Sequence, residues 1–329
     1  MGLLKTAAIG DTTLLSAVVR DIAATPSVEL VLFVGRDNAG VAELIEGPRS
    51  VVTLPVTRPW AGARLLRRHQ LDLLIDCGAW PRVDAVLTAL SGARTTAGFR
   101  TAGQGRHFAY DVAVQHRGDL HELENYRRLV AAAGFRTRHA PALRVPPLAH
   151  PDWLPPQPYA VCHLWPGGTG SVHREWPLDR WRALIERIVA DGTNVVLTGG
   201  LSDVHRAREA HASLAHLGAR VVNAAGALSL VSLAGVLRRS RLVVSVNTGV
   251  MHVAAVLGAP TISLDGPTDS ARWGPVGARA RSVRSSLPGC GYLDLGWEYD
   301  GQRTDCMQGI AVEDVLQAAT ELLRDLDNT

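Results

Sequence analysis

Four polar turns, each at the end of a predicted strand, contain the residue types that could do chemistry in this chain. The first turn holds Gly10 and Asp11, directly after an apolar run. A carboxylate placed there could take a proton from a hydroxyl group, which is the role of a general base. Aspartate is also a favoured N-cap, so capping of the next helix is the alternative role for Asp11.

The second turn is rich in glycine and has the sequence WPGGTGSVHREWP, residues 165–177. Glycines let backbone N–H groups approach a phosphate closely, and Arg174 can supply positive charge. Thr169 lies in the middle of the turn. The pattern is neither a Walker motif nor G-x-G-x-x-G, and a loop without a ligand is the alternative.

The third turn, TGGLSD at residues 198–203, places Asp203 where it could hold a ribose or cap the next helix. The fourth turn, SVNTGVMH at residues 245–252, opens an apolar helix. The free N–H groups and positive dipole end of such a helix suit a diphosphate. Asn247 could instead cap this helix, and His252 could be a histidine of the core.

These turns need parallel strands to bring them to one edge of a sheet. Apolar runs without strict alternation, which are typical of strands covered by helices on both faces, recur along the chain. The predicted strands lie at residues 3–9, 29–34, 51–54, 71–77, 112–114, 159–164, 194–198, 221–223, 242–246 and 261–264. The predicted helices lie at residues 13–25, 41–46, 83–91, 122–133, 178–190, 203–217, 229–238, 248–257 and 312–326.

A proline-rich stretch divides this alternation into two halves. Seven of the 18 prolines lie between residues 141 and 158, and proline removes a backbone donor, so we expect a linker there. A chain of 329 residues is long enough for two domains. We therefore predict an α/β protein with two doubly wound, Rossmann-like domains facing a cleft.

Composition excludes several classes of protein. The net charge is only +3, which argues against a nucleic-acid partner. Lys5 is the only lysine, and so strong a bias toward arginine is typical of a GC-rich genome. The four cysteines are far apart and form no C-x-x-C pair, which argues against a zinc or iron–sulfur site and fits a reducing cytoplasm. A Cys290–Cys306 pair is therefore not expected.

Residues 242–264 form an uncharged run that is long enough to span a bilayer. Polar residues, Gly258 and Pro260 interrupt it, so we predict a strand, a turn, a helix, a turn and a strand. No signal peptide is visible. We expect a cytoplasmic protein with at most peripheral membrane association.

The sequence resembles glycosyltransferase family 9, whose best-known members are the ADP-heptose:lipopolysaccharide heptosyltransferases with the GT-B fold. The resemblance rests on NTGVMHVAAVLGAP at residues 247–260, followed closely by GPTDSARWGP at residues 266–275. Support comes from WPGGTGSVHREWPLDRW, VVLTGGLSD, CMQGIAVEDVL, IGD and HELENYRRL, at residues 165–181, 195–203, 306–316, 9–11 and 121–129. The resemblance to the family is strong after residue 159 and weak between about residues 30 and 110.

The resemblance implies an inverting, metal-independent glycosyltransferase without a cofactor, whose co-substrate is ADP-heptose. It implies that residues 1–150 bind the acceptor and residues 151–329 the nucleotide-sugar, with the last helix packing back on the first domain. Asp11 falls on the general base, with Gly10 and Arg100 beside the acceptor. The implied donor-binding residues are Thr169, Arg174, Asp203, Asn247, Thr248, Gly249, Val250 and His252.

Two positions depart from the family pattern, since Asn247 stands where the family usually has aspartate and Arg174 where it usually has lysine. The family's acceptor, a lipopolysaccharide core, is anionic and could meet Arg94, Arg100 and Arg106; scattered surface arginines are the alternative explanation. In a source without lipopolysaccharide the acceptor would be a small-molecule natural product. A sugar-nucleotide epimerase or hydrolase of the same fold, or a non-catalytic nucleotide-sugar-binding protein, are the alternative functions.

Overall fold

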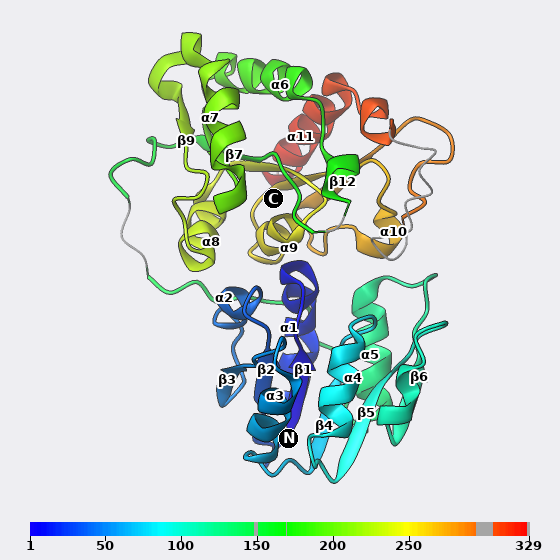
Figure 1. Ribbon diagram of the computed structural model, residues 1–329. Helices are drawn as coiled ribbons and strands as arrows, with labels where there is room; N and C mark the ends of the chain where they lie inside the picture. The colour runs from blue at the N-terminus through cyan, green and yellow to red at the C-terminus, as the bar shows by residue number, and fades with distance from the viewer. Residues whose placement is uncertain (148–150, 169, 294–304, 328–329) are drawn as a thin grey trace. The chain divides into compact units, whose positions relative to one another are not determined.

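The computed structural model describes residues 1–147, 151–168, 170–293 and 305–327. The chain divides into two compact units, Met1–Arg144 and Val145–Thr329, and the division falls inside the proline-rich stretch. Each unit is built on one six-stranded sheet with helices against it (Figure 1). All strand pairs in both sheets are parallel, so the predicted α/β class is confirmed.

The first unit has the sheet order β3-β2-β1-β4-β5-β6. The order changes direction between β1 and β4, and in open parallel sheets ligands bind beyond the carboxyl ends of the strands at such a switch point. The strands are β1 Gly2–Lys5, β2 Val31–Val34, β3 Ser50–Thr53, β4 Leu73–Asp76, β5 Thr95–Arg100 and β6 Val112–Gln115. The helices are α1 Ile9–Ala23, α2 Ala39–Ala42, α3 Pro59–Arg67, α4 Arg82–Ala89, η1 Arg106–Ala109 and α5 Glu122–Ala132.

Helices cover both faces of this sheet. Side chains alternate between the two faces along a strand, so Leu4 and Leu74 point to one side and Leu3 and Ile75 to the other. Leu4 and Leu74 pack with Leu66 of α3 and Leu87 of α4. On the opposite face α1 and α5 contact each other. Burial on both faces explains the continuous apolar strands.

The second unit has the order β12-β11-β10-β7-β8-β9. When the strands of each unit are numbered from its own first strand, the second sheet has the same strand order as the first. Its switch point lies between β7 and β10. The strands are β7 Tyr159–His163, β8 Asn194–Thr198, β9 Val221–Asn223, β10 Leu242–Val246, β11 Thr261–Asp265 and β12 Ala280–Arg284. The helices are η2 Ser171–Arg174, α6 Leu178–Ala190, η3 Leu201–Asp203, α7 Val204–Ala212, η4 Ala215–Arg220, α8 Leu230–Arg239, α9 Gly249–Val256, α10 Ser270–Trp273, η5 Cys306–Gly309 and α11 Val312–Asp327.

The core of this unit lies between the sheet and α6, α7 and α11. Trp181 of α6 and Val315 of α11 pack there against Cys162 and Val244, while α8 and α9 contact each other separately. α11 contacts α6, β11 and β12 of its own unit. The predicted strand–helix–strand pattern of residues 242–264 is confirmed as β10, α9 and β11. Over the described residues, no helix has the length and apolar character needed to cross a membrane.

Candidate functional site

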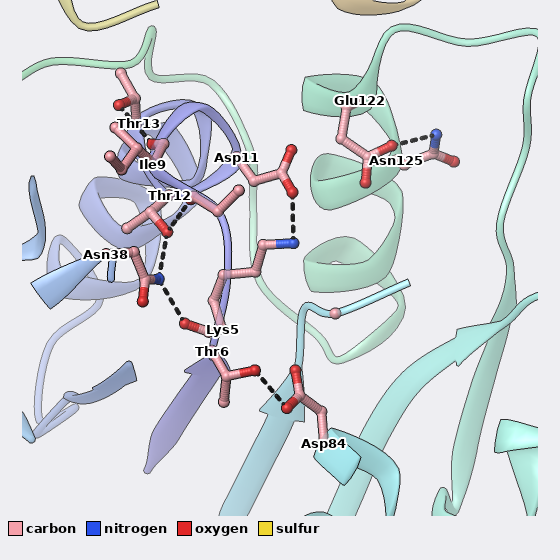
Figure 2. Close-up of polar contacts among 12 residues, drawn as sticks. Lys5, Thr6, Ile9, Asp11, Thr12, Thr13, Asn38, Asp84, Glu122 and Asn125 are labelled. Atoms are coloured by element: carbon pink, nitrogen blue, oxygen red, sulfur yellow. Dashed lines mark hydrogen bonds and ion pairs between the residues drawn. The ribbon is translucent and has the colours of Figure 1, made fainter. Parts of the chain in front are cut away.

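The first candidate site lies where β1 ends and α1 begins, beside the switch point of the first sheet. α1 begins at Ile9, so Gly10 and Asp11 lie in its first turn, and the N-cap residue is Ala8. The capping role considered for Asp11 is therefore wrong. The Asp11 carboxylate oxygen Oδ2 lies 2.9 Å from Lys5 Nζ, so an ion pair stands at the carboxyl end of the central strand (Figure 2).

Lys5 is the buried partner of this pair, with 3% of its side chain exposed against 18% for Asp11. Burial, the largest single influence on the pKa of Lys5, lowers it, but the charges of Asp11, Glu122 and Asp84 together outweigh burial and raise that pKa. Lys5 therefore stays an ammonium and orients the carboxylate without covering it. The sequence reasoning missed this role, although a single lysine in the whole chain was a signal.

Buried hydrogen bonds anchor the backbone on either side of this ion pair (Figure 2). Thr6 Oγ1 donates to Asp84 Oδ1 at 2.6 Å, and Asn38 Nδ2 donates to the Lys5 carbonyl at 2.8 Å. Asn38 Nδ2 also donates to Thr12 Oγ1 at 2.7 Å, which ties the end of β1 to the first turn of α1. The turn that bears the carboxylate is thus held in place by four side chains, those of Thr6, Thr12, Asn38 and Asp84.

The arginines considered for an anionic acceptor differ in exposure. Arg106 is fully buried and its Nη2 donates to Asp76 Oδ2 at 2.7 Å, so its placement on the surface is wrong. Burial raises the pKa of Asp76 to about 7, although Arg106 opposes the shift. A guanidinium enclosed with a buried carboxylate is part of the structure of the unit. Arg94 is exposed and pairs with Asp72, and Arg100 ends β5 with an exposed side chain.

The second candidate site lies at the switch point of the second sheet, where β10 ends and α9 begins. Thr248 is the N-cap residue, so the capping role considered for Asn247 is wrong. The first N–H groups of a helix lack carbonyl partners within it and form the positive end of its dipole. Those of Gly249 and Val250 can therefore donate to an anion. His252 is buried in the same helix.

The Asn247 side chain is held by two acceptors through one nitrogen. Its Nδ2 donates to Asp265 Oδ1 at 2.7 Å and to the Trp273 carbonyl at 3.0 Å. Asp265 ends β11, is 1% exposed, and also accepts from Ser263 Oγ at 2.8 Å. Burial raises the pKa of Asp265, while hydrogen bonds, including those from Asn247 and Ser263, oppose the shift. Sequence reasoning gave Asp265 no role, and the signal for one was an acidic residue at the end of a buried strand.

The glycine-rich loop follows β7, the strand beside β10. Gly168 and Gly170 have φ of 88° and 65°, a region that residues with a side chain rarely adopt. Arg174 Nη2 donates to the Gly167 carbonyl at 2.7 Å, and its Nη1 donates to the Asn247 carbonyl at 3.3 Å. The loop thus brings a guanidinium to Asn247, which directly precedes the N-cap residue of α9. Thr169 lies outside the described residues.

Asp203 lies in the turn after β8, and both of its carboxylate oxygens are engaged. Oδ2 accepts from the Gly200 N–H at 2.7 Å, and Oδ1 accepts from Arg206 Nε at 3.0 Å. Arg206 also donates to Glu175 Oε1 at 2.6 Å, and its guanidinium lies 4.9 Å from the centroid of the Trp165 ring. Asp203 therefore stabilises the turn and orients Arg206, and its part in ribose binding stays a prediction.

The cysteine prediction is wrong at one place, because Cys290 and Cys306 form a disulfide bond. Cys77 and Cys162 are buried free thiols. Spacing alone could not show the pairing, which depends on the segment after β12 lying beside η5, where the Ser286 N–H donates to the Gly309 carbonyl at 2.9 Å. In the part of the chain that the structure describes, no group of three or more His, Cys, Asp or Glu residues could hold a metal ion.

Sequence comparison finds relatives of one kind. Residues 60–291 match the model of glycosyltransferase family 9 (heptosyltransferase). The lipopolysaccharide heptosyltransferase 1 of Pseudomonas aeruginosa is 39% identical over 123 residues, which are 37% of this chain and 33% of that protein. The lipopolysaccharide heptosyltransferase 1 of Salmonella typhimurium is 35% identical over 138 residues, 42% of this chain and 41% of that protein. The matched segment spans less than half the length of either relative.

Solved structures match nearly the whole chain. The E. coli ADP-heptose lps heptosyltransferase II has a TM-score of 0.80 at 20% identity, with 99% of both chains covered. The E. coli heptosyltransferase WaaC, solved with ADP, has a TM-score of 0.74 at 21% identity, with 98% of this chain and 99% of that chain covered. Identities this low show the fold, and it is the GT-B fold predicted from the sequence.

Proposed function

The chain belongs to glycosyltransferase family 9, and on this premise we propose that it transfers a heptose from an ADP-sugar to a hydroxyl group of an acceptor. A lipopolysaccharide core is the proposed acceptor, with a small-molecule natural product as the second acceptor to test. One observation supports this function best: the start of α9 combines unpaired backbone donors with Arg174, and no acidic side chain occupies positions 248–250. These groups suit the phosphates of a nucleotide-sugar.

The proposed chemistry is a single displacement. Asp11 accepts the proton of the acceptor hydroxyl, and the hydroxyl oxygen attacks the anomeric carbon of the donor. The bond from that carbon to the phosphate oxygen breaks, and ADP leaves with its electron pair, so the configuration at the carbon inverts. The 18% exposure of Asp11 leaves the base accessible, while Lys5 keeps its carboxylate oriented.

The leaving group gains negative charge as the bond breaks. The N–H groups of Gly249 and Val250 and the guanidinium of Arg174 are proposed to meet this charge without a metal ion. In other enzymes, removing one such preorganised donor costs about 3–4 kcal/mol of transition-state stabilisation. In this proposal residues 1–150 bind the acceptor, residues 151–329 bind the donor, and the enzyme acts in the cytoplasm with at most peripheral contact with a membrane.

The first experiment is calorimetric titration with ADP, UDP, GDP and dTDP in the presence of EDTA. We expect selective binding of ADP to the wild type and loss of that binding in Thr248→Trp, because an indole there would fill the space in front of the α9 donors. Thr320→Trp adds the same side chain to an exposed position on α11 and serves as the matched control. It should bind ADP as the wild type does.

If the protein bound another nucleotide more tightly than ADP, ADP-heptose would no longer be the proposed donor. Glycosyltransferase activity would then be tested with sugars carried by the preferred nucleotide. Absence of binding to all four nucleotides would refute the assignment of the donor site. A transfer assay with ADP-heptose and EDTA then tests the chemistry, and abolition of transfer by EDTA would refute metal independence.

A further inference from the structure

The Asn247 amide has only one orientation that its surroundings accept. Its Nδ2 lies 2.7 Å from Asp265 Oδ1 and 3.0 Å from the Trp273 carbonyl oxygen. A carbonyl oxygen can only accept a hydrogen bond, so rotating the amide by half a turn would set two oxygens against each other at hydrogen-bond distance. The contacts therefore identify which end of the amide points inward.

The other end of the amide, Asn247 Oδ1, receives no hydrogen bond from any residue that the structure describes. Asn247 as a whole is 6% exposed and directly precedes Thr248, the N-cap residue of α9. The backbone carbonyl of Asn247 accepts from Arg174 Nη1 at 3.3 Å, so Asn247 itself contacts one of the proposed phosphate-binding groups. The side-chain oxygen that lacks a partner thus belongs to a residue of the proposed donor site.

The buried Asp265 carboxyl is costly to the fold. It is 1% exposed, and its Oδ2 is buried without a hydrogen-bond partner in the described parts of the chain. A buried carboxylate with an unsatisfied oxygen is costly, and an apolar residue would suit the end of a buried strand better. An apolar residue could not accept the hydrogen bonds from Ser263 Oγ and Asn247 Nδ2, and of these two donors Asn247 is the one that belongs to the proposed donor site.

We propose that Asp265 is a positioning residue for donor recognition: it fixes the Asn247 amide so that Oδ1 accepts a hydrogen bond from a hydroxyl group of the donor sugar. This inference rests on the proposed function and deepens it. The Asp265 carboxyl accepts from Nδ2, and this hydrogen bond polarises the amide and strengthens its Oδ1 as an acceptor. The pair selects a hydroxyl at that position over a group that cannot donate.

The main test compares ADP with ADP-heptose, both titrated by calorimetry without acceptor. Asp265→Val removes one of the two acceptors that hold the amide, so only the Trp273 carbonyl still accepts from Asn247 Nδ2. We expect the affinity for ADP-heptose to fall about tenfold and the affinity for ADP, which has no sugar at this position, to stay within about twofold. Thr261→Val makes a similar polar-to-apolar change at a buried position of β11 that does not contact Asn247, and it should alter neither affinity.

A charge swap provides the second test. Asn247→Asp alone sets two carboxylates against each other at the present 2.7 Å contact and should weaken ADP-heptose binding more than Asp265→Val does. In the double variant Asn247→Asp with Asp265→Asn, the inner amide donates to the outer carboxylate. We expect it to bind ADP-heptose at least about tenfold more tightly than Asn247→Asp alone.

The possible outcomes distinguish failure of this inference from failure of the proposed function. Failure of the wild type to bind ADP would refute the donor site itself. Normal ADP binding with equal losses for ADP and ADP-heptose in Asp265→Val would show a merely structural role and overturn the inference. Unchanged ADP-heptose binding in Asp265→Val, or no recovery in the double variant, would overturn it as well.

Discussion

The two switch points have the same position in the same strand order but present different polar groups. At the first, a buried ammonium and a partly exposed carboxylate face each other across 2.9 Å. At the second, the groups near the end of β10 are the Asn247 amide, the first backbone N–H groups of α9 and the Arg174 guanidinium, and the acid Asp265 is enclosed behind the amide. The strand order determines where along the sheet a ligand can bind. The residues that follow each strand determine whether that place holds a proton acceptor or binds an anion.

In the proposed function, the same strand order thus serves two parts of one reaction. A base must keep a lone pair within reach of its substrate, so Asp11 keeps part of its surface exposed. A phosphate site must present donors and keep negative charge away, so Asp265 is covered. Each prediction below changes one of these two arrangements.

The largest expected effect is on catalysis at the first switch point. Asp11→Asn removes the proton acceptor, and we expect kcat for transfer from ADP-heptose to fall by about 10³-fold, within the range for loss of a general base. ADP affinity should stay unchanged, because the proposed ADP site lies in the other unit. Asp119→Asn, an exposed acid of the same unit, is the control. Normal turnover by Asp11→Asn would remove Asp11 as the base.

The second effect is a pH dependence at the second switch point. His163 ends β7 and bonds to Thr198 Oγ1 at 2.9 Å, and burial lowers its pKa to about 4. The unfolded chain takes up this proton near pH 6.5 and the folded chain only near pH 4, so stability is lost as the pH falls between these values. The loss approaches about 3 kcal/mol for this group.

His163→Gln removes the titrating group and keeps a side chain that can bond to Thr198. We expect the difference in free energy of unfolding between wild type and variant, measured with urea, to change in favour of the variant from pH 6.5 to pH 4. A constant difference over that range would show that His163 titrates alike in both states. The surroundings of His163 in the folded state would then not disfavour its protonation.

The third effect concerns the stability of the ion pair. Lys5→Met leaves Asp11 without its partner, and we expect the free energy of unfolding to fall by about 2 kcal/mol, less than for a fully buried pair because Asp11 can contact water. Adding Asp11→Asn to Lys5→Met should cost little more, because the pair is already broken. Strictly additive losses in urea unfolding would show that the two side chains do not interact.

The smallest effect concerns the anion site. Arg174→Ala removes the charge beside α9, and we expect ADP affinity to fall about tenfold, with Arg174→Lys in between because an ammonium keeps the charge but not the fork. Calorimetry measures both. Gly167 and Asn247 each lose a hydrogen bond to their carbonyl in Arg174→Ala, so the melting temperature serves as a check on folding. Unchanged ADP affinity in both variants would exclude Arg174 from the donor site.

Apolar patterning predicted part of the second unit closely. The bounds of α6, β8, β9 and β10 agree with the predicted ranges, whereas β12 and α10 were missed. In the first unit β5 and α3 were missed. β5 contains Gly98, and a Cβ there would lie 2.4 Å from the ring of Tyr110. Glycine weakens the strand pattern, and the contact that requires it lies outside the strand.

The candidate site divides in a similar way. Turn chemistry could identify Asp11 and the start of α9, because strand ends and helix starts are local features. It could not identify the partners Lys5 and Asp265, since each acts through a contact that depends on how the chain folds. The same holds for Arg106, which looks like a surface residue in the sequence and is buried against Asp76.

Because Lys5 is buried, cleavage of the chain after Lys5 also reports local opening of the first unit. A protease that cuts only after lysine has one target bond in the whole chain, at the end of the central strand β1. That bond can be cleaved only when β1 separates from β2 and β4, its neighbours on both sides. The rate of this single cut therefore measures how often the centre of the first sheet opens, without any label being attached.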